Sequence, residues 1–340
     1  MILQLAKKSN PEFRTIVFSI SSVNTIEEKF KENGIEYHFL NINSFKNSTL
    51  IDGLRKLHSV LKDIPDAVFH CHQFHGNFLA VLYKIFYQGK IRFAFTMHTN
   101  KVESVVRRIF LFITKPLRSA DIIFSHNSNK WYLKNTAVIP NGVDFSCFTA
   151  NTKRNHKKSD TFSFLYLGRL SSEKNPFQLI DAAQYLVQNN VNDFIIEYVG
   201  DGGLREELEK EIDTKQLGKF FKFHGFQSDI QPFIQNSHCL VLPSFREGMP
   251  VVIIEAAAAL LPVIATPVGS IPDFMNEANG YLCEPQEFGK TMMHVLRSYE
   301  EALVKANELN SDVKTIFDID KVYLQHLSLY RSYLALNHNE

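Results

Sequence analysis

Short apolar segments alternate with longer segments of helical composition along most of this 340-residue chain. The clearest apolar segments lie in the second half, and a glycine, proline or threonine directly follows most of them. They are Phe162–Leu167, Phe194–Val199, Phe220–Phe223, Cys239–Leu242 and Val263–Ala265. Strands that helices cover on both faces are apolar almost throughout, and such strands pair in parallel. The pattern therefore predicts an α/β fold built on parallel sheets.

The length of the chain and one polar segment predict two domains. A chain of 340 residues can form two domains that each have a core. The segment Asn151–Asp160 (NTKRNHKKSD) interrupts the alternation of strands and helices. Residues 149–160 are therefore predicted to link a domain of residues 1–148 to a domain of residues 161–320.

A loop-to-helix junction in the second half carries two carboxylates. Glu247-Gly-Met-Pro precedes a buried helical sequence, VVIIEAAAALL, which contains Glu255 about two turns further on. The free N–H groups at the helix start, near Gly248 and Met249, form an anion site. A carboxylate on each side of an anion site suits a ligand with phosphate in the middle and hydroxyls at both ends, such as a nucleotide sugar. The alternative is a buried helix with one Glu near its start and one satisfied Glu inside it.

Two cations follow the first apolar segment of the second half. Arg169 and Lys174 lie in one predicted strand-to-helix loop, where side chains converge on the carboxyl ends of the strands. Arginine offers a planar fork and lysine a point charge, and both suit phosphate. The alternative is a pair of solvated surface cations.

Six motifs of the second half resemble, in order and spacing, the donor-binding half of the retaining glycosyltransferases of family four. They are GRL…EKN, VGDGG, HGF, LPSFREGMPVVIIEA, PVIATPVGSIPDF and NGYL. The first half resembles the family more loosely, through strand segments that lead to His72 and His98. The resemblance implies the GT-B fold, in which two Rossmann-like α/β domains face each other across a cleft. It also implies that the last helix, Lys321–Leu336, packs back on the first domain.

The resemblance further implies transfer of a sugar from a nucleoside diphosphate sugar to a glycan or glycolipid acceptor, with retained anomeric configuration. It implies no metal ion, no cofactor and no nucleic acid. Glu247 would hold sugar hydroxyls, Glu255 would hold the ribose, and Phe226 of the HGF motif would belong to the nucleotide site. His98 would contact the sugar or its phosphate. The residues expected to stabilise charge on the leaving phosphate are Arg169, Lys174, Gly248 and Met249.

Two departures from the family pattern affect the predicted function. Ser270 and Asp273 stand where the family more often has Gly and Glu. Met1–Lys8 is typical of the end of the family's first helix and Phe13–Ile20 of its second strand, so the first strand and its glycine-rich loop are expected to be missing. Either the start is shortened or the chain has lost activity, and we expect nucleotide binding with poor sugar transfer. The alternatives are a non-catalytic nucleotide-sugar-binding or assembly subunit and a sugar-nucleotide epimerase of the same fold.

Three histidines suggest a different chemistry. His70, His72 and His75 resemble a metal cluster, because His-x-His at a strand end puts two imidazoles on one face. A metal hydrolase would need further ligands from other strands, and the sequence offers no convincing set.

Charge is divided unevenly along the chain. Residues 1–150 carry 19 Lys and Arg against 11 Asp and Glu, whereas residues 151–340 carry 18 against 25. The basic half indicates an anionic partner, either a membrane surface or a charged acceptor. Lys101–Ser119 predicts either a helix at a membrane interface or a core-facing helix, and the core-facing helix is preferred because apolar residues surround most of its circumference.

Other features bear on localisation. No run of ~20 apolar residues predicts a membrane span. The four cysteines lack metal or redox spacing, which fits a reducing cytoplasm and, with the basic half, peripheral contact with the inner face of the membrane.

Overall fold

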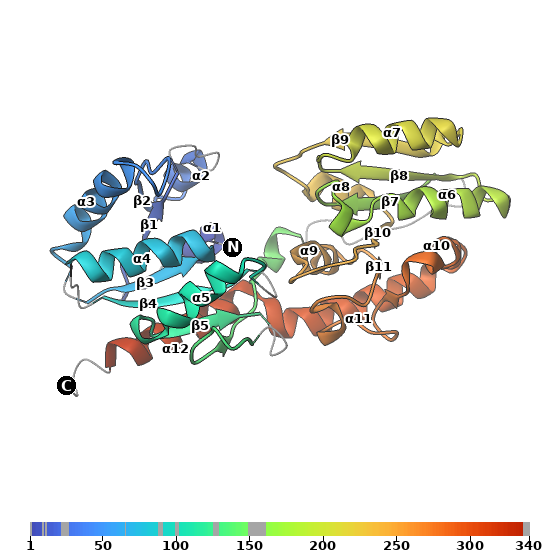
Figure 1. Cartoon of the computed structure of the whole chain (residues 1–340). Helices are drawn as coiled ribbons and strands as arrows, with labels where there is room; N and C mark the ends of the chain where they lie inside the picture. The colour runs from blue at the N-terminus through green and yellow to red at the C-terminus, as the bar shows by residue number, and fades with distance from the viewer. Residues whose placement is uncertain are drawn as a thin grey trace. The chain divides into compact units, whose positions relative to one another are not determined.

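The computed structural model describes residues 2–335 except 9, 11, 22–26, 65, 88–90, 99–101, 125–128 and 149–160. The chain divides into two compact units, an amino-terminal unit of Met1–Gly142 with Ile319–Glu340 and a carboxyl-terminal unit of Val143–Asp318 (Figure 1). The predicted linker at residues 149–160 lies outside the described residues.

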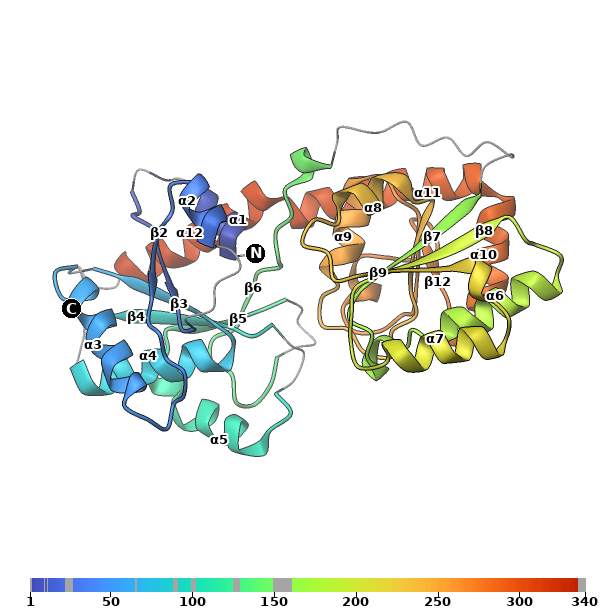
Figure 2. The same cartoon turned by 90° about the horizontal axis from the view of Figure 1, so that it is seen from above.

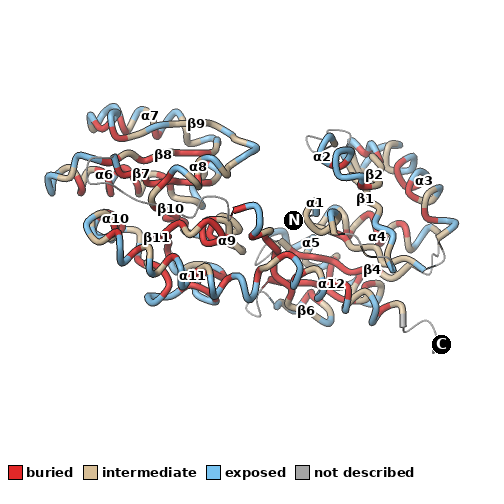
Figure 3. Tube along the Cα trace, turned by 180° about the vertical axis from the view of Figure 1, so that it is seen from behind, coloured by how far each residue is buried: buried red, intermediate tan, exposed pale blue. Residues whose placement is uncertain are grey.

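The carboxyl-terminal unit is built on a parallel sheet of six strands in the order β12-β11-β10-β7-β8-β9. The strands are β7 (Phe162–Leu167), β8 (Phe194–Val199), β9 (Phe221–Gly225), β10 (Cys239–Leu242), β11 (Val263–Ala265) and β12 (Tyr281–Leu282). Every residue of β7, β10 and β11 is buried, as Figure 3 shows along these strands. Burial on both faces explains why these strands are apolar except for Ser163 of β7.

Helices cover both faces of this sheet, so the unit has two cores. The helices are α6 (Gln178–Gln188), α7 (Arg205–Thr214), α8 (Gln231–Asn236), α9 (Val251–Ala258), α10 (Phe288–Arg297) and α11 (Tyr299–Phe317). One core includes Leu179 of α6, Leu208 of α7 and Phe288 of α10. The other includes Ile253 of α9 and Leu309 of α11, and Figure 2 shows α8, α9 and α11 together on that side of the sheet.

The amino-terminal unit contains two parallel sheets, one with the order β3-β4-β5-β6 and one formed by β1 and β2. Its strands are β1 (Ile16–Ser19), β2 (Glu36–Phe39), β3 (Val68–His72), β4 (Arg92–Thr96), β5 (Ala120–Ile123) and β6 (Ala137–Val138). Its helices are α1 (Ile2–Lys7), α2 (Glu27–Glu32), α3 (Thr49–Leu61), α4 (Gln73–Tyr87), α5 (Val105–Ile113) and α12 (Ile319–Ala335). The predicted α/β class with parallel sheets is thus confirmed.

The last helix, α12, belongs to the amino-terminal unit. Its Val322 and Tyr333 share a core with Ala94 of β4, and Leu5 of α1 packs against this core. Leu324 does not contribute to it, because 60% of this residue is exposed.

Helix α5 is only in part the core-facing helix that its sequence predicts. Leu111 is its only buried residue, and most of its apolar side chains are exposed. The helix faces the core through Leu111 and Phe110, as the preferred interpretation has it, but its other side is largely apolar. None of the described helices combines the length and the apolarity needed to cross a membrane.

Candidate functional site

The topology of the carboxyl-terminal unit defines one place for a ligand. Strands β7 and β10 are neighbours in the sheet. From β7 the chain adds β8 and β9 on one side of the sheet, and from β10 it adds β11 and β12 on the other side. In such sheets a crevice forms at the carboxyl ends of the strands, at the point where the strand order reverses. The loop after β7 contains Arg169 and Lys174, and the loop after β10 contains Glu247.

The structure brings Lys174 and Glu247 together at this point. The Lys174 ammonium donates to both Glu247 carboxylate oxygens at 2.7 Å. The Ser244 hydroxyl also donates to Glu247 Oε1, at 2.7 Å. Only 4% of the Glu247 side chain is exposed, against 27% of the Lys174 side chain. A buried carboxylate is thus held by one cation and one hydroxyl, with the cation still open to solvent on one side.

The loops around the ion pair pack closely against one another through their backbones. A Cβ atom on Gly202 would lie 2.3 Å from the carbonyl oxygen of Leu170, and one on Gly269 would lie 2.2 Å from that of Glu247. Gly269 also has a φ of +66°, which other residues rarely adopt. The Phe245 N–H donates to the Glu173 carbonyl at 2.8 Å, which joins the loops after β7 and β10. These loops therefore form one connected rim at the carboxyl ends of the strands.

Helix α9 begins beside this rim. Pro250 is its N-cap and no side chain caps it, so the first turn leaves backbone N–H groups without helical partners. Gly248 and Met249 directly precede it, and the Gly248 carbonyl accepts from the Ser270 N–H at 3.2 Å. The helix ends at Ala258, earlier than its sequence suggests, because Leu260 adopts a left-handed φ of 56°.

Glu255 lies in α9 and is the second carboxylate of the site. Burial raises the pKa of its carboxyl to about 7. Among the described residues no Lys or Arg side chain forms an ion pair with Glu255, whereas Glu247 has Lys174. A half-buried carboxylate of this kind can accept hydrogen bonds from ligand hydroxyls that replace the lost water.

Two predicted residues lie apart from the Lys174–Glu247 pair. Arg169 is exposed, and its side chain has no partner among the described residues, although the Tyr166 hydroxyl fixes its carbonyl at 2.9 Å. Phe226 follows the edge strand β9 and is 78% exposed. A base could stack on such a ring, but no described contact joins Phe226 to Glu247.

His98 lies in the amino-terminal unit, at the carboxyl end of β4. Its Nε2 lies 3.0 Å from His72 Nδ1, and its ring packs edge-on against Phe124. Burial lowers the pKa of His98 to about 4 and that of His72 to about 3, so both imidazoles are neutral near pH 7. His70 next to them is bonded to Thr96 and Tyr330, and His75 stacks on Phe45 instead of joining the cluster.

The histidines do not support the metal hydrolase alternative. Among the described residues, no group of three or more His, Cys, Asp or Glu side chains is placed to hold a metal ion.

Sequence reasoning missed the role of Ser244. The signal was available, because Ser244 follows β10 at the point where the strand order reverses. Its buried hydroxyl is one of the groups that fix the Glu247 carboxylate.

Comparisons with known proteins agree with this architecture. Residues 148–309, most of the carboxyl-terminal unit, match the family described as glycosyl transferases group 1. Over 297 residues the chain is 27% identical to the UDP-Gal:alpha-D-GlcNAc-diphosphoundecaprenol alpha-1,3-galactosyltransferase of Escherichia coli, covering 80% of this chain and 77% of that protein. It is 30% identical over 198 residues to the putative teichuronic acid biosynthesis glycosyltransferase TuaC of Bacillus subtilis (strain 168), a match that spans 55% of this chain and 48% of that protein.

The fold also has close counterparts among solved structures. The crystal structure of HepE from Anabaena in complex with UDP and glucose has a TM-score of 0.80 at 18% identity, covering 97% of this chain and 95% of that one. The architecture and the matches identify the chain as a glycosyltransferase with the GT-B fold. The predicted enzyme class is confirmed.

Proposed function

We propose that this glycosyltransferase moves a sugar from a nucleoside diphosphate sugar to a glycan or lipid-linked acceptor, with retention of anomeric configuration and without a metal ion. The pathway we propose is surface polysaccharide biosynthesis, at the cytoplasmic face of the membrane. The observation that carries the proposal is the Lys174–Glu247 pair at the carboxyl ends of β7 and β10. Support for the acceptor comes from the E. coli relative, whose name specifies a diphosphoundecaprenol substrate.

The ion pair offers a way to couple recognition of phosphate and sugar. Lys174 is held by Glu247 in this structure. A donor diphosphate would compete for the ammonium, and the released carboxylate would accept hydrogen bonds from the sugar hydroxyls. One exchange of partners would then bind both reacting parts of the donor, and Ser244 would keep the carboxylate in place during it.

Charge on the leaving diphosphate is the main electrostatic problem of this reaction. Lys174, the exposed Arg169 and the N–H groups at the start of α9 would stabilise that charge as it develops. Glu255 would accept hydrogen bonds from the ribose at the nucleoside end. His98, neutral near pH 7, would donate to or accept from the sugar or its phosphate. Catalysis would then depend mainly on positioning and on charge stabilisation.

Calorimetric titration tests this proposal. UDP, GDP and ADP are titrated in excess chelator into the wild-type chain, into Lys174→Met and into the matched control Lys210→Met, which changes an exposed lysine of α7. We expect at least one nucleotide to bind the wild type and the control without metal. We expect Lys174→Met to weaken that binding ~10-fold or more, because a charge-assisted hydrogen bond is lost. Binding that requires Mg²⁺ or Mn²⁺, or equal binding by all three proteins, would contradict the proposal.

A further inference from the structure

Helix α5 exposes an apolar stripe. Four of its five exposed apolar side chains lie three or four residues from the fifth, Ile109, so the five share one face of the helix. They are Val105, Val106, Ile109, Phe112 and Ile113, with exposures from 48% to 76%. Isolated exposed apolar residues are ordinary, whereas a continuous apolar face marks an interaction surface.

The opposite side of α5 is already packed. Leu111 is fully buried, and the Phe110 ring lies 5.6 Å from that of Phe74 and 5.3 Å from that of Phe78 of α4. The helix therefore cannot turn its exposed stripe inward without breaking these contacts. The apolar stripe remains on the surface of the amino-terminal unit.

Trp131 extends the stripe. Its indole is 55% exposed, and its ring centroid lies 5.3 Å from that of Phe112. The Lys115 ammonium lies 5.0 Å above the Phe112 ring and donates to the Trp131 carbonyl. We call the five stripe residues together with Trp131 the α5 patch.

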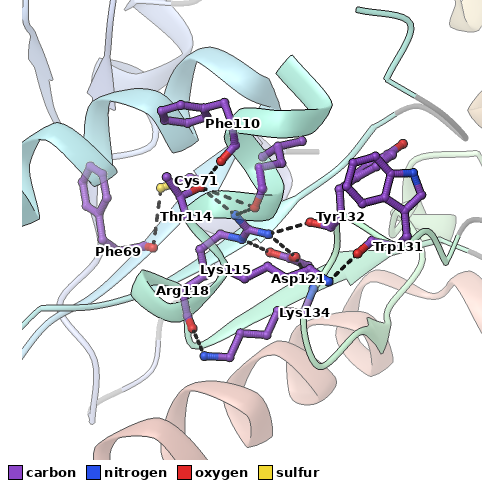
Figure 4. A network of polar contacts seen from close by, with 11 residues as sticks. Phe69, Cys71, Phe110, Thr114, Lys115, Arg118, Asp121, Trp131, Tyr132 and Lys134 are labelled. Carbon is purple, nitrogen blue, oxygen red and sulfur yellow. Dashed lines mark hydrogen bonds and ion pairs between the residues drawn. The ribbon is translucent and has the colours of Figure 1, made fainter. Parts of the chain in front are cut away.

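A buried polar network holds the α5 patch in shape (Figure 4). The Arg118 guanidinium donates to the Leu111 carbonyl at the end of α5 and to the Tyr132 carbonyl beside Trp131. Both Asp121 oxygens accept from Arg118, at 2.6 and 2.8 Å. One side chain therefore joins the helix end to the loop of Trp131. Because the patch is ordered before any partner arrives, binding requires little further loss of conformational entropy.

Cations border the α5 patch. Arg107 lies over the Phe74 ring at 4.9 Å, and Arg108 is bonded to the Glu103 carbonyl by one of its nitrogens. Arg108 and Lys115 thus accompany an apolar surface that also presents Phe and Trp rings, whereas Arg107 lies on the side of α5 that packs on α4. This combination matches an anionic bilayer, where aromatic side chains settle at the interface and cations meet lipid headgroups.

We infer that the α5 patch docks the amino-terminal unit on the surface of an anionic lipid bilayer. Docking buries the apolar stripe and Trp131 among the headgroups and leaves Arg108 and Lys115 at the phosphates. The inference rests on the proposed function in one respect, because docking on a bilayer would give the enzyme access to a lipid-linked acceptor. The segment of α5 follows β4 and His98 along the chain, so the docked surface is close in sequence to a residue proposed to contact the transferred sugar or its phosphate.

The test uses the single tryptophan of the chain as a local probe. The full chain is mixed, without substrate, with vesicles of phosphatidylcholine alone or with phosphatidylglycerol. We expect sedimentation with the anionic vesicles and a blue shift of Trp131 emission, both reduced at high salt. Arg108→Gln should weaken binding at low salt.

The decisive variant is Phe112→Ser with Ile113→Ser, and the matched control is Val304→Ser with Ile316→Ser, which changes two exposed apolar residues of α11. We expect the α5 variant to partition onto anionic vesicles ~10-fold less than the wild type, and the control to be unchanged. Equal binding of both variants, or absence of vesicle binding by the wild type, would overturn the inference. So would wild-type dimers, seen by light scattering, that the α5 variant abolishes while no protein binds vesicles.

Nucleotide titration of the same proteins separates this inference from the proposed function. If vesicles bind and nucleotides do not, the proposed function fails and the docking surface stands. If nucleotides bind and vesicles do not, the reverse holds.

Discussion

At the scale of single residues, the two carboxylates of the site differ in their partners. Glu247 is buried and paired with Lys174, whereas burial raises the pKa of Glu255 to about 7 and no Lys or Arg of the described residues forms an ion pair with it. The sequence predicted both carboxylates and the lysine. It could not predict their pairing, because Lys174 and Glu247 lie on separate loops that only the sheet order brings together. Arg169 and Phe226 have the predicted loop positions, but their side chains point to no common contact in this structure.

Binding of a nucleoside diphosphate that carries no sugar should distinguish the roles of Glu255 and Glu247. At pH 8, where Glu255 is mostly ionised, we expect Glu255→Gln to weaken binding of a nucleoside diphosphate ~10-fold or more, since a charge-assisted bond to the ribose is lost. Glu247→Gln should leave that affinity unchanged or raise it, because Lys174 no longer has to leave a carboxylate. Calorimetry with a nucleotide that carries no sugar measures both. Equal losses would show that the roles are assigned wrongly.

The pKa of Glu255 also has a consequence for stability. Between pH 4.5 and 7 the folded chain holds a proton on Glu255 that the unfolded chain has released, so this residue lowers the free energy of unfolding as pH rises. Relative to the wild type, Glu255→Gln should therefore be more stable at pH 8 than at pH 5, by roughly 1–3 kcal/mol. Urea denaturation at the two pH values measures the difference. A difference of the opposite sign would contradict the raised pKa.

At the scale of elements, strands were predicted more accurately than helix faces. Strands β7, β8, β10 and β11 occupy the predicted residues. Each is buried on both faces and is therefore a short apolar segment, and the loops on either side of it differ from it in composition, so its ends can be read from the sequence. Helix α5 was predicted as core-facing, since composition alone does not say which side of an apolar helix finds a partner. The rim loops contain the sequence motifs. The structure shows why glycine is needed in them, because a neighbouring backbone carbonyl leaves no room for a Cβ at Gly202 or Gly269.

Gly269 should be intolerant of a side chain, unlike Gly203. Gly269→Ala puts a Cβ 2.2 Å from the Glu247 carbonyl at a positive φ, whereas a Cβ on Gly203 meets nothing within 4 Å. We expect Gly269→Ala to lower stability by about 1–3 kcal/mol and to weaken nucleotide binding through displacement of Glu247. Gly203→Ala should change neither. Thermal unfolding and calorimetry of both variants provide the comparison, and similar behaviour of the pair would argue against a tightly packed rim.

At the scale of the whole molecule, the proposed function assigns different binding roles to the two units. The carboxyl-terminal unit holds the ion pair, Glu255 and the start of α9, so nucleotide recognition belongs to it. The amino-terminal unit holds the α5 patch, which we infer to contact the lipid surface, and His98, which we propose to contact the sugar or its phosphate. The resemblance predicted this division through motifs, which were dense in the second half and sparse in the first. Side-chain exposure on α5 required the packed structure.

Hydrogen exchange with and without nucleotide tests the central claim most directly, because it reports where the ligand binds along the chain. The amides of residues 168–176, in the loop after β7, and of residues 244–254, in the loop after β10 and the first turn of α9, are measured with a saturating nucleoside diphosphate in excess chelator. The account predicts slower exchange in both segments, with the α5 segment unchanged. Protection confined to the amino-terminal unit, or to the edge of the sheet at β12, would contradict it.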